Sequence, residues 1–140
     1  MTGVQTCCSS DLGSGYQAAV LAELAGEVHT IERLASLAER ARAVLVAAGY
    51  GGVKVHVGDG TLGDPAHSPF AGIAVAAAAP DIPPSLYAQL EPGGRLVLPV
   101  GGREGQELHV VVRSPEGPAV LRSVPCRFVP LVGQEGFGRE

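Results

Sequence analysis

Several residue types are scarce in this sequence, and each shortage excludes a class of protein. Only three of the 140 residues are cysteine, and their spacing suits neither a disulfide framework nor a zinc finger, so we expect reduced thiols. No apolar run approaches the roughly 20 residues that a membrane-spanning helix needs, and no signal peptide is evident. Lys and Arg number 10 against 14 acidic residues, which argues against nucleic-acid binding. We therefore expect a cytoplasmic protein whose partners are neither nucleic acids nor membranes.

The abundant residues indicate one folded α/β domain. Hydrophobic residues make up 46% of the chain and charged residues 17%, which is enough apolar material for a single core. Stretches with apolar residues at helical spacing alternate with short strand-like runs rich in valine and isoleucine. The predicted helices span residues 16–25, 36–48 and 83–90, and the predicted strands span residues 27–31, 53–57, 73–79, 95–100, 107–113 and 120–132.

This order of elements predicts a mostly parallel sheet covered by helices on both faces, with antiparallel strands at its C-terminal edge. Ser36 and Glu39 have the spacing of a helix capping box, and Pro92-Gly93-Gly94 predicts a turn. Residues 1–12 show neither helical nor strand periodicity, so the pattern begins at Gly13.

Three loops carry candidate ligand-binding residues. Gly13-Ser14-Gly15 directly precedes a predicted helix, where backbone amides can face a ligand at close range. Glu32 ends a predicted strand about seventeen residues later, near the spacing at which an acid meets ribose hydroxyls in nucleotide-binding folds. Asp59, at the end of the next strand, can accept a hydrogen bond from an exocyclic amine.

Each of these features also has an ordinary structural interpretation. A lone Gly-Ser-Gly is more often a turn, Glu32 can pair with Arg33 at the surface, and aspartate is common in turns such as the one at Asp59. A glycine-rich turn followed by an acid also suits NAD, so an NAD-dependent oxidoreductase stays a remote alternative, although the full G-x-G-x-x-G pattern is missing.

Seven segments in order resemble the protein-L-isoaspartate O-methyltransferase family. They are Gly13-Ser14-Gly15-Tyr16-Gln17-Ala18-Ala19, Ile31-Glu32-Arg33, Val57-Gly58-Asp59-Gly60, Ala77-Ala78-Ala79-Pro80, Leu90-Glu91-Pro92-Gly93-Gly94-Arg95-Leu96, Pro99-Val100-Gly101 and Arg127-Phe128-Val129-Pro130-Leu131. The resemblance covers about residues 13–136 and implies a Rossmann-like, S-adenosylmethionine-dependent methyltransferase fold.

The resemblance also implies an activity and a set of site residues. The activity is methyl transfer from S-adenosylmethionine to the free carboxyl of L-isoaspartyl and D-aspartyl residues in damaged proteins, which begins their repair. The implied cofactor-binding residues are Gly13, Ser14, Gly15, Glu32, Arg33, Asp59 and Gly60, and the implied substrate cleft is lined by Ala77, Ala78 and Pro80. Methyl transfer from a sulfonium needs alignment and desolvation rather than a metal or a covalent nucleophile.

The chain also departs from the family. The buried first strand that normally enters the glycine loop is missing or replaced, and residues 1–12 look like an adapter or cloning artefact joined to a partial methyltransferase domain at 13–140. The N-terminal region that carries the family's serine near the transferred methyl has no counterpart, so no catalytic residue is predicted. A catalytically inactive fragment that binds S-adenosylmethionine is therefore the main alternative.

The four histidines suggest no other chemistry. His29 and His56 lie in strand patterns, His67 in a proline-containing loop and His109 in a late strand. Because no His-x-x-His or Cys/His spacing occurs, we expect ordinary surface or edge histidines and no metal site.

Overall fold

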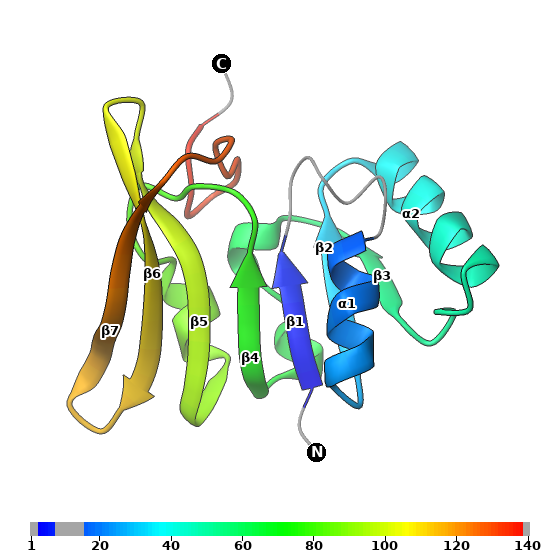
Figure 1. Cartoon of the computed structure of the whole chain (residues 1–140), viewed down its shortest axis with the longest axis horizontal. Helices are drawn as coiled ribbons and strands as arrows, with labels where there is room; N and C mark the ends of the chain where they lie inside the picture. The colour runs from blue at the N-terminus through cyan, green and yellow to red at the C-terminus, as the bar shows by residue number, and fades with distance from the viewer. Residues whose placement is uncertain (1–2, 8–15, 139–140) are drawn as a thin grey trace.

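The computed structural model describes residues 3–7 and 16–138, and its centre is a seven-stranded sheet in the order β3-β2-β1-β4-β5-β6-β7 (Figure 1). The strands are β1 (Gly3–Cys7), β2 (Val28–Glu32), β3 (Lys54–Val57), β4 (Phe70–Val75), β5 (Leu90–Gly102), β6 (Gly105–Ser114) and β7 (Gly117–Cys126). The first five pair in parallel, and β6 and β7 add antiparallel strands at one edge. The predicted mostly parallel sheet with an antiparallel C-terminal edge is confirmed.

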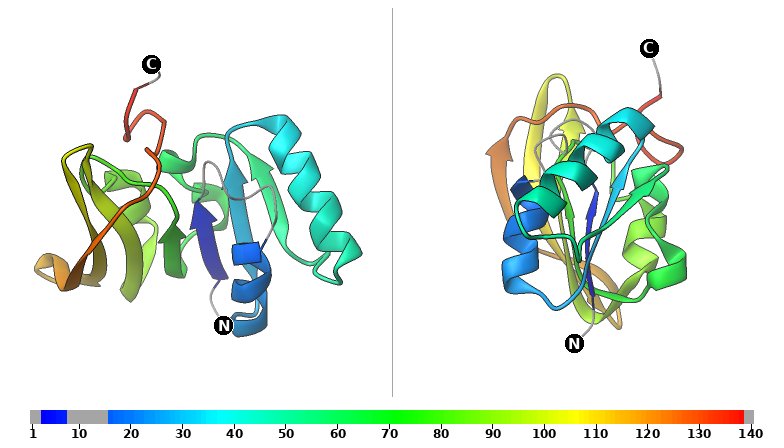
Figure 2. Two further views of the ribbon diagram at one scale, coloured as in Figure 1. Left: turned by 45° about the horizontal axis from the view of Figure 1, so that its top comes forward. Right: turned by 90° about the vertical axis from the view of Figure 1, so that its right-hand side faces the viewer.

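Helices cover both faces of the parallel part of the sheet. Figure 1 shows α1 (Tyr16–Leu24) in front of the sheet and α3 (Pro84–Ala88) behind it, and Figure 2 shows the two layers from other sides. One buried cluster joins α1 and α2 (Ala35–Ala47) to the sheet and contains Ala18, Val28, Ala38, Leu45, Val53 and Val55. Among the described helices, none is long and apolar enough to cross a membrane.

The larger core lies on the opposite face, under α3. Its buried side chains include Phe70, Ile73, Val75, Leu86, Leu90, Leu96, Leu98, Val111 and Leu131. Two short 3-10 helices, η2 (Gly60–Leu62) and η3 (Pro65–His67), follow β3 and lead into β4. Phe70, Ile73 and Val75 of β4 are buried and the residues between them are half-buried, in keeping with a continuous apolar run in a strand that is covered on both faces.

The central strand β1 is made by residues for which the sequence showed no strand pattern. Gly3–Cys7 lies between β2 and β4, with Val4 opposite Val28 on one side and Gly72 on the other. The first strand, expected to be missing or replaced, is therefore formed by residues 3–7 although their sequence shows no strand periodicity. Buried strands on both sides present unpaired N–H and C=O groups, and an extended segment satisfies them whatever its local pattern.

Other local predictions need correction. Helix α2 has Leu34 as its N-cap without a side-chain cap bond, so the Ser36 and Glu39 capping box does not form, and Glu39 pairs with Arg42 instead. The predicted turn at residues 92–94 is a bulge inside β5, where Gly93 has φ +80° and the register opposite β4 jumps from Leu90 to Arg95. Strand β7 ends at Cys126 rather than at residue 132.

Candidate functional site

The predicted site residues follow the carboxyl ends of β2, β3 and β4. Because β2 and β4 pair in parallel with β1, and β3 pairs in parallel with β2, their carboxyl ends lie along one edge of the sheet, at the top in Figure 1. Ligands of open α/β sheets bind at this edge. Gly13, Ser14 and Gly15 lie outside the described residues.

Glu32 is the last residue of β2 and its side chain is fully buried. One carboxylate oxygen, Oε1, accepts a hydrogen bond of 3.1 Å from the backbone N–H of Leu34. The other oxygen, Oε2, is buried and has no hydrogen-bond partner among the described residues. Burial raises the pKa of Glu32, and it outweighs the backbone N–H groups of Leu34 and Arg33 and the Arg33 charge, which lower it. A buried acceptor without a donor is costly unless a ligand supplies one.

Asp59 holds the loop after β3 in place. Its Oδ1 accepts hydrogen bonds from the Thr61 N–H at 2.9 Å and the Thr61 hydroxyl at 2.7 Å, and its Oδ2 accepts one of 2.8 Å from the Gln134 N–H. Burial acts to raise the pKa of Asp59, but the hydrogen bonds from Gln134 and Thr61, with the charge of Arg33, together bring it below its ordinary value. A carboxylate has about four acceptor sites, so Oδ2 retains room for one further donor.

Arg33 and Gly60 complete the predicted cofactor set among the described residues. Gly60 is buried at the start of η2, directly after Asp59. Arg33 is half-buried, and its charge lowers the pKa of both Glu32 and Asp59. For each carboxylate this charge is the smallest of the effects on the pKa.

The predicted cleft residues after β4 are largely enclosed. The side chains of Ala77 and Ala78 are fully buried, whereas Pro80 is exposed. The N–H of Ala78 donates to the Val129 carbonyl at 2.7 Å, and the Ala78 carbonyl accepts from the Leu131 N–H at 2.8 Å. The main chain at this point is thus held by the segment that follows β7, and a role of Ala77, Ala78 and Pro80 in a substrate cleft stays a prediction.

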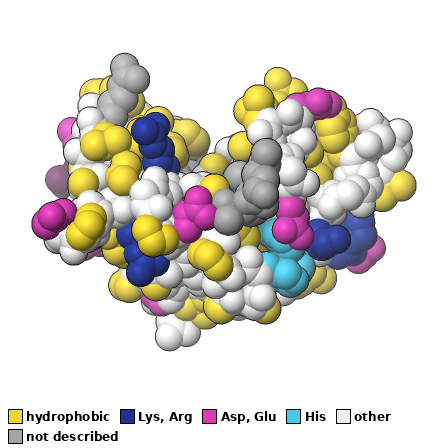
Figure 3. All heavy atoms as spheres, turned by 90° about the horizontal axis from the view of Figure 1, so that it is seen from below, with side chains coloured by type: hydrophobic (Ala, Val, Ile, Leu, Met, Phe, Trp, Pro, Cys, Tyr) yellow, Lys and Arg dark blue, Asp and Glu magenta, His cyan; other side chains and the backbone are white. Residues whose placement is uncertain are grey.

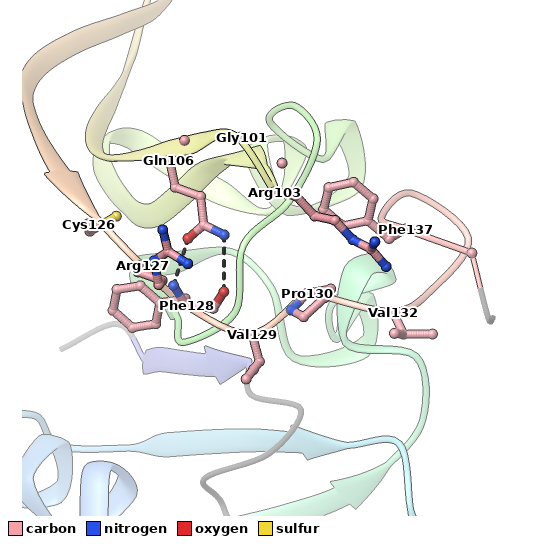
Figure 4. Close-up of a pocket in the computed structure, with 13 residues that line it drawn as sticks. Gly101, Arg103, Gln106, Cys126, Arg127, Phe128, Val129, Pro130, Val132 and Phe137 are labelled. Atoms are coloured by element: carbon pink, nitrogen blue, oxygen red, sulfur yellow. Dashed lines mark hydrogen bonds between the residues drawn. The ribbon is translucent and has the colours of Figure 1, made fainter.

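A cavity of about 950 Å³ lies beside this edge, between the β5–β6 turn and the chain after β7 (Figure 4). Its lining includes Arg103, Gln106, Cys126, Phe128, Val129 and Phe137. The Gln106 side chain fixes one wall by bonding both the N–H and the carbonyl of Phe128, at 2.7 and 3.0 Å. Burial, and then the charge of Glu107, raises the pKa of Cys126, which argues against a thiolate nucleophile.

Sequence reasoning placed residues 127–131 in the resemblance but gave them no role in a site. The structure brings the backbone of Val129 and Leu131 against Ala78, and residues 127–130 line one side of the cavity. In the sequence, only the resemblance of residues 127–131 to the family pointed to this part of the chain. Residues 101–106 and 126–138 are far apart in the sequence and meet only through the pairing of β5, β6 and β7.

Comparisons with known proteins agree on one family. Residues 10–136 match the model of the family described as protein-L-isoaspartate(D-aspartate) O-methyltransferase. A protein-L-isoaspartate O-methyltransferase of Syntrophus aciditrophicus is 53% identical over 128 residues, which cover 89% of this chain and 59% of that protein. A second one, from Geotalea uraniireducens, is 46% identical over 142 residues, which cover 100% of this chain and 65% of that protein. The chain thus spans less than two thirds of the length of these relatives.

Solved structures give the same result for the fold. A protein-L-isoaspartate O-methyltransferase superimposes with a TM-score of 0.84 at 25% identity, over 96% of this chain and 44% of that one. The O-methyltransferase TomG from Streptomyces achromogenes, solved in complex with SAM, reaches a TM-score of 0.52 at 32% identity, over 68% of this chain and 48% of its own. The sheet and its helical layers are therefore those of a Rossmann-like methyltransferase.

Proposed function

The chain belongs to the protein-L-isoaspartate(D-aspartate) O-methyltransferase family, and from this membership we propose that it serves methyl transfer from S-adenosylmethionine to the free carboxyl of L-isoaspartyl and D-aspartyl residues in damaged proteins. The partners in this proposal are protein or peptide substrates, and the location is the cytoplasm. The cofactor would supply an already activated methyl group on its sulfonium. The chain would then bind the cofactor and the substrate carboxyl, align them and exclude water from between them.

One observation carries the cofactor part of the proposal, namely that Oε2 of Glu32 has no donor among residues 3–7 and 16–138. A fully buried carboxylate oxygen of this kind, at the carboxyl end of β2, fits a ligand that brings hydroxyl groups, as a ribose does. Glu32 would accept the ribose hydroxyl hydrogens, while Asp59 Oδ2, with one acceptor site remaining, would accept from an exocyclic amine. Gly60 would border the adenine ring. The hydrogen bonds from Gln134 and Thr61, with the charge of Arg33, would keep Asp59 ionised.

Calorimetric titration of the chain with S-adenosylhomocysteine tests the cofactor site. We expect saturable binding that weakens at least tenfold in Glu32→Gln, because the amide presents an N–H₂ group where the hydroxyls need an acceptor. NAD is the control ligand. Binding of NAD alone would overturn the family-based proposal in favour of an oxidoreductase.

A second candidate function is cofactor binding without methyl transfer. The chain spans 59% and 65% of the two relatives, so cofactor binding and methyl transfer by this chain are measured separately. Transfer of labelled methyl from S-adenosylmethionine to an isoaspartyl peptide separates the two candidates, with the matching aspartyl peptide as the control. Transfer to the isoaspartyl peptide alone supports the enzyme, whereas binding without transfer supports the inactive fragment.

A further inference from the structure

Three histidines and one aspartate from separate segments converge on the face of the sheet that also carries α3. His29 comes from β2, His56 from β3, and Asp64 and His67 from the loop that forms η3. One ligand atom from each of the four residues lies within 4.8 Å of all the others. Figure 3 shows a single gathering of histidine side chains (cyan) with acidic side chains beside it. This cluster is separate from Glu32. Glu32 lies three residues after His29 on β2, and alternation along a strand puts the two side chains on opposite faces of the sheet.

The separations within the cluster match those of a tetrahedral metal site. His29 Nδ1 lies 3.0 Å from His56 Nε2, and each of these nitrogens lies 3.4 Å from Asp64 Oδ2. His67 Nδ1 lies 2.7 Å from the same oxygen. Ligand atoms about 2.0–2.2 Å from a zinc ion stand roughly 3.3 Å apart in a tetrahedron. Four of the six separations among these atoms therefore lie within about 0.6 Å of the tetrahedral value.

The surroundings of His29 also suit a metal ligand. Its side chain is 1% exposed, and its second nitrogen, Nε2, has no hydrogen bond among the described residues although Glu27 Oε1 lies 3.2 Å from it. Histidine ligands commonly direct their second N–H at a carboxylate, which orients the ring and leaves the other nitrogen free to bind metal. Glu27 is placed to do this for His29.

From this geometry we propose that His29, His56, Asp64 and His67 form a structural zinc site. Three imidazole nitrogens and one carboxylate oxygen are the donor set that zinc takes readily, and four protein ligands leave no open position for catalysis. The ion would tie the edge strand β3 and the η2–η3 loop to β2. The same loop begins with Asp59, so zinc would stiffen the support of the cofactor site without taking part in methyl transfer. This inference does not depend on the proposed function.

Calorimetric titration of the chelator-treated full chain with zinc chloride tests the site. We expect one zinc per chain, with affinity reduced at least tenfold in His67→Ala and in Asp64→Asn, and unchanged in His109→Ala. The side chain of His67 is 44% exposed, so its removal leaves the core intact, and circular dichroism checks each variant for folding. If Asp64→Asn fails to fold, His67→Ala still decides the question.

Cobalt(II) provides a second measurement, because tetrahedral coordination gives strong visible absorption bands that octahedral coordination lacks. These bands are expected in the wild type and in His109→Ala and should be lost in His67→Ala. Three results would overturn the proposal: no zinc binding, equal affinity in wild type and both ligand variants, or binding that survives in those variants and disappears when Cys126 and the other thiols are alkylated.

Discussion

The backbone N–H of Gln134 donates a 2.8 Å hydrogen bond to Asp59 Oδ2, which joins two residues 75 positions apart in the chain. The next residue, Glu135, donates its N–H to the Thr61 hydroxyl at 3.1 Å and accepts from the Ser85 N–H at 2.8 Å through its side chain. The C-terminal segment thus holds in place the loop that contains Asp59, one of the predicted cofactor-binding residues. The conformation of η2 therefore depends on residues 134 and 135 as well as on its own sequence.

The C-terminal segment packs against the Asp59 loop at Gly133, where there is no room for a side chain. Gly133→Ala is therefore expected to loosen the contact between this segment and the loop. A Cβ at residue 133 would overlap Asp59 Oδ1 and the side chain of Thr61. Overpacking of this kind costs about 1–3 kcal/mol, which should appear in urea unfolding, and amide exchange over residues 134–137 should accelerate. Gly138→Ala is the matched control, because nothing lies within 4 Å of a Cβ at that position. Equal behaviour of the two variants would show that the segment does not dock.

Glu32→Gln is expected to stabilise the chain while it weakens cofactor binding. Burial raises the pKa of Glu32 in the folded state, so the stability it contributes is complete below the unfolded pKa and is lost as pH rises through the folded pKa. The neutral amide retains an oxygen for the Leu34 N–H and should add about 1 kcal/mol at neutral pH. Urea unfolding at several pH values measures this gain. A variant less stable than wild type at pH 7 would contradict the buried, unpaired state of Oε2.

Asp59→Asn is expected to change the pH dependence of stability in the opposite direction to Glu32→Gln. The pKa of Asp59 is lowered in the folded state, so its contribution is present above the unfolded pKa and disappears as pH falls through the folded value. Asparagine cannot accept with both side-chain atoms, so it loses part of the bonding to Thr61 and Gln134, at a cost of about 1–2 kcal/mol at neutral pH. Acid titration followed by circular dichroism should show a smaller loss of stability in the variant. If wild type and Asp59→Asn lost stability in parallel as the pH falls, the hydrogen bonds to ionised Asp59 would not contribute to stability.

Gln89→Ala is expected to detach the η2–η3 loop from the start of β5. The Gln89 side chain is buried, accepts from the Asp64 N–H and donates to the Leu62 carbonyl, both at 2.8 Å. Its removal leaves two backbone groups without partners, which costs about 2–3 kcal/mol, and should also lower zinc affinity because Asp64 is released. Gln17→Ala on α1 serves as the control for loss of a glutamine. Unfolding midpoints that shift equally in both variants would refute the proposed anchor.

Much of the fold could be predicted from the sequence, because the patterns that determine its helices and strands are local. Three local patterns predicted β3, α1 and the β6–β7 pair, whose bounds in the structure differ by a few residues. They are the alternating valines at residues 53–57, the alanine- and leucine-rich stretch 16–25, and the paired valine-rich runs near the C-terminus. The likeness of seven short segments to one family identified that family, and the family model matching residues 10–136 confirms it. Glu32 and Asp59 were predicted from their positions after strands, and the structure places both there.

Tertiary structure alone decided the rest, because it depends on groups far apart in the chain. Gly3–Cys7 became the central strand since β2 and β4 present open hydrogen-bonding edges on both sides, whatever the local pattern of that segment. His29, predicted to be a surface or edge histidine, is buried, and it meets His56 and His67 only because parallel pairing of β2 with β3 and the return of the η3 loop bring three segments to one point. Local spacing carries no trace of such convergence, which is why a motif search finds none.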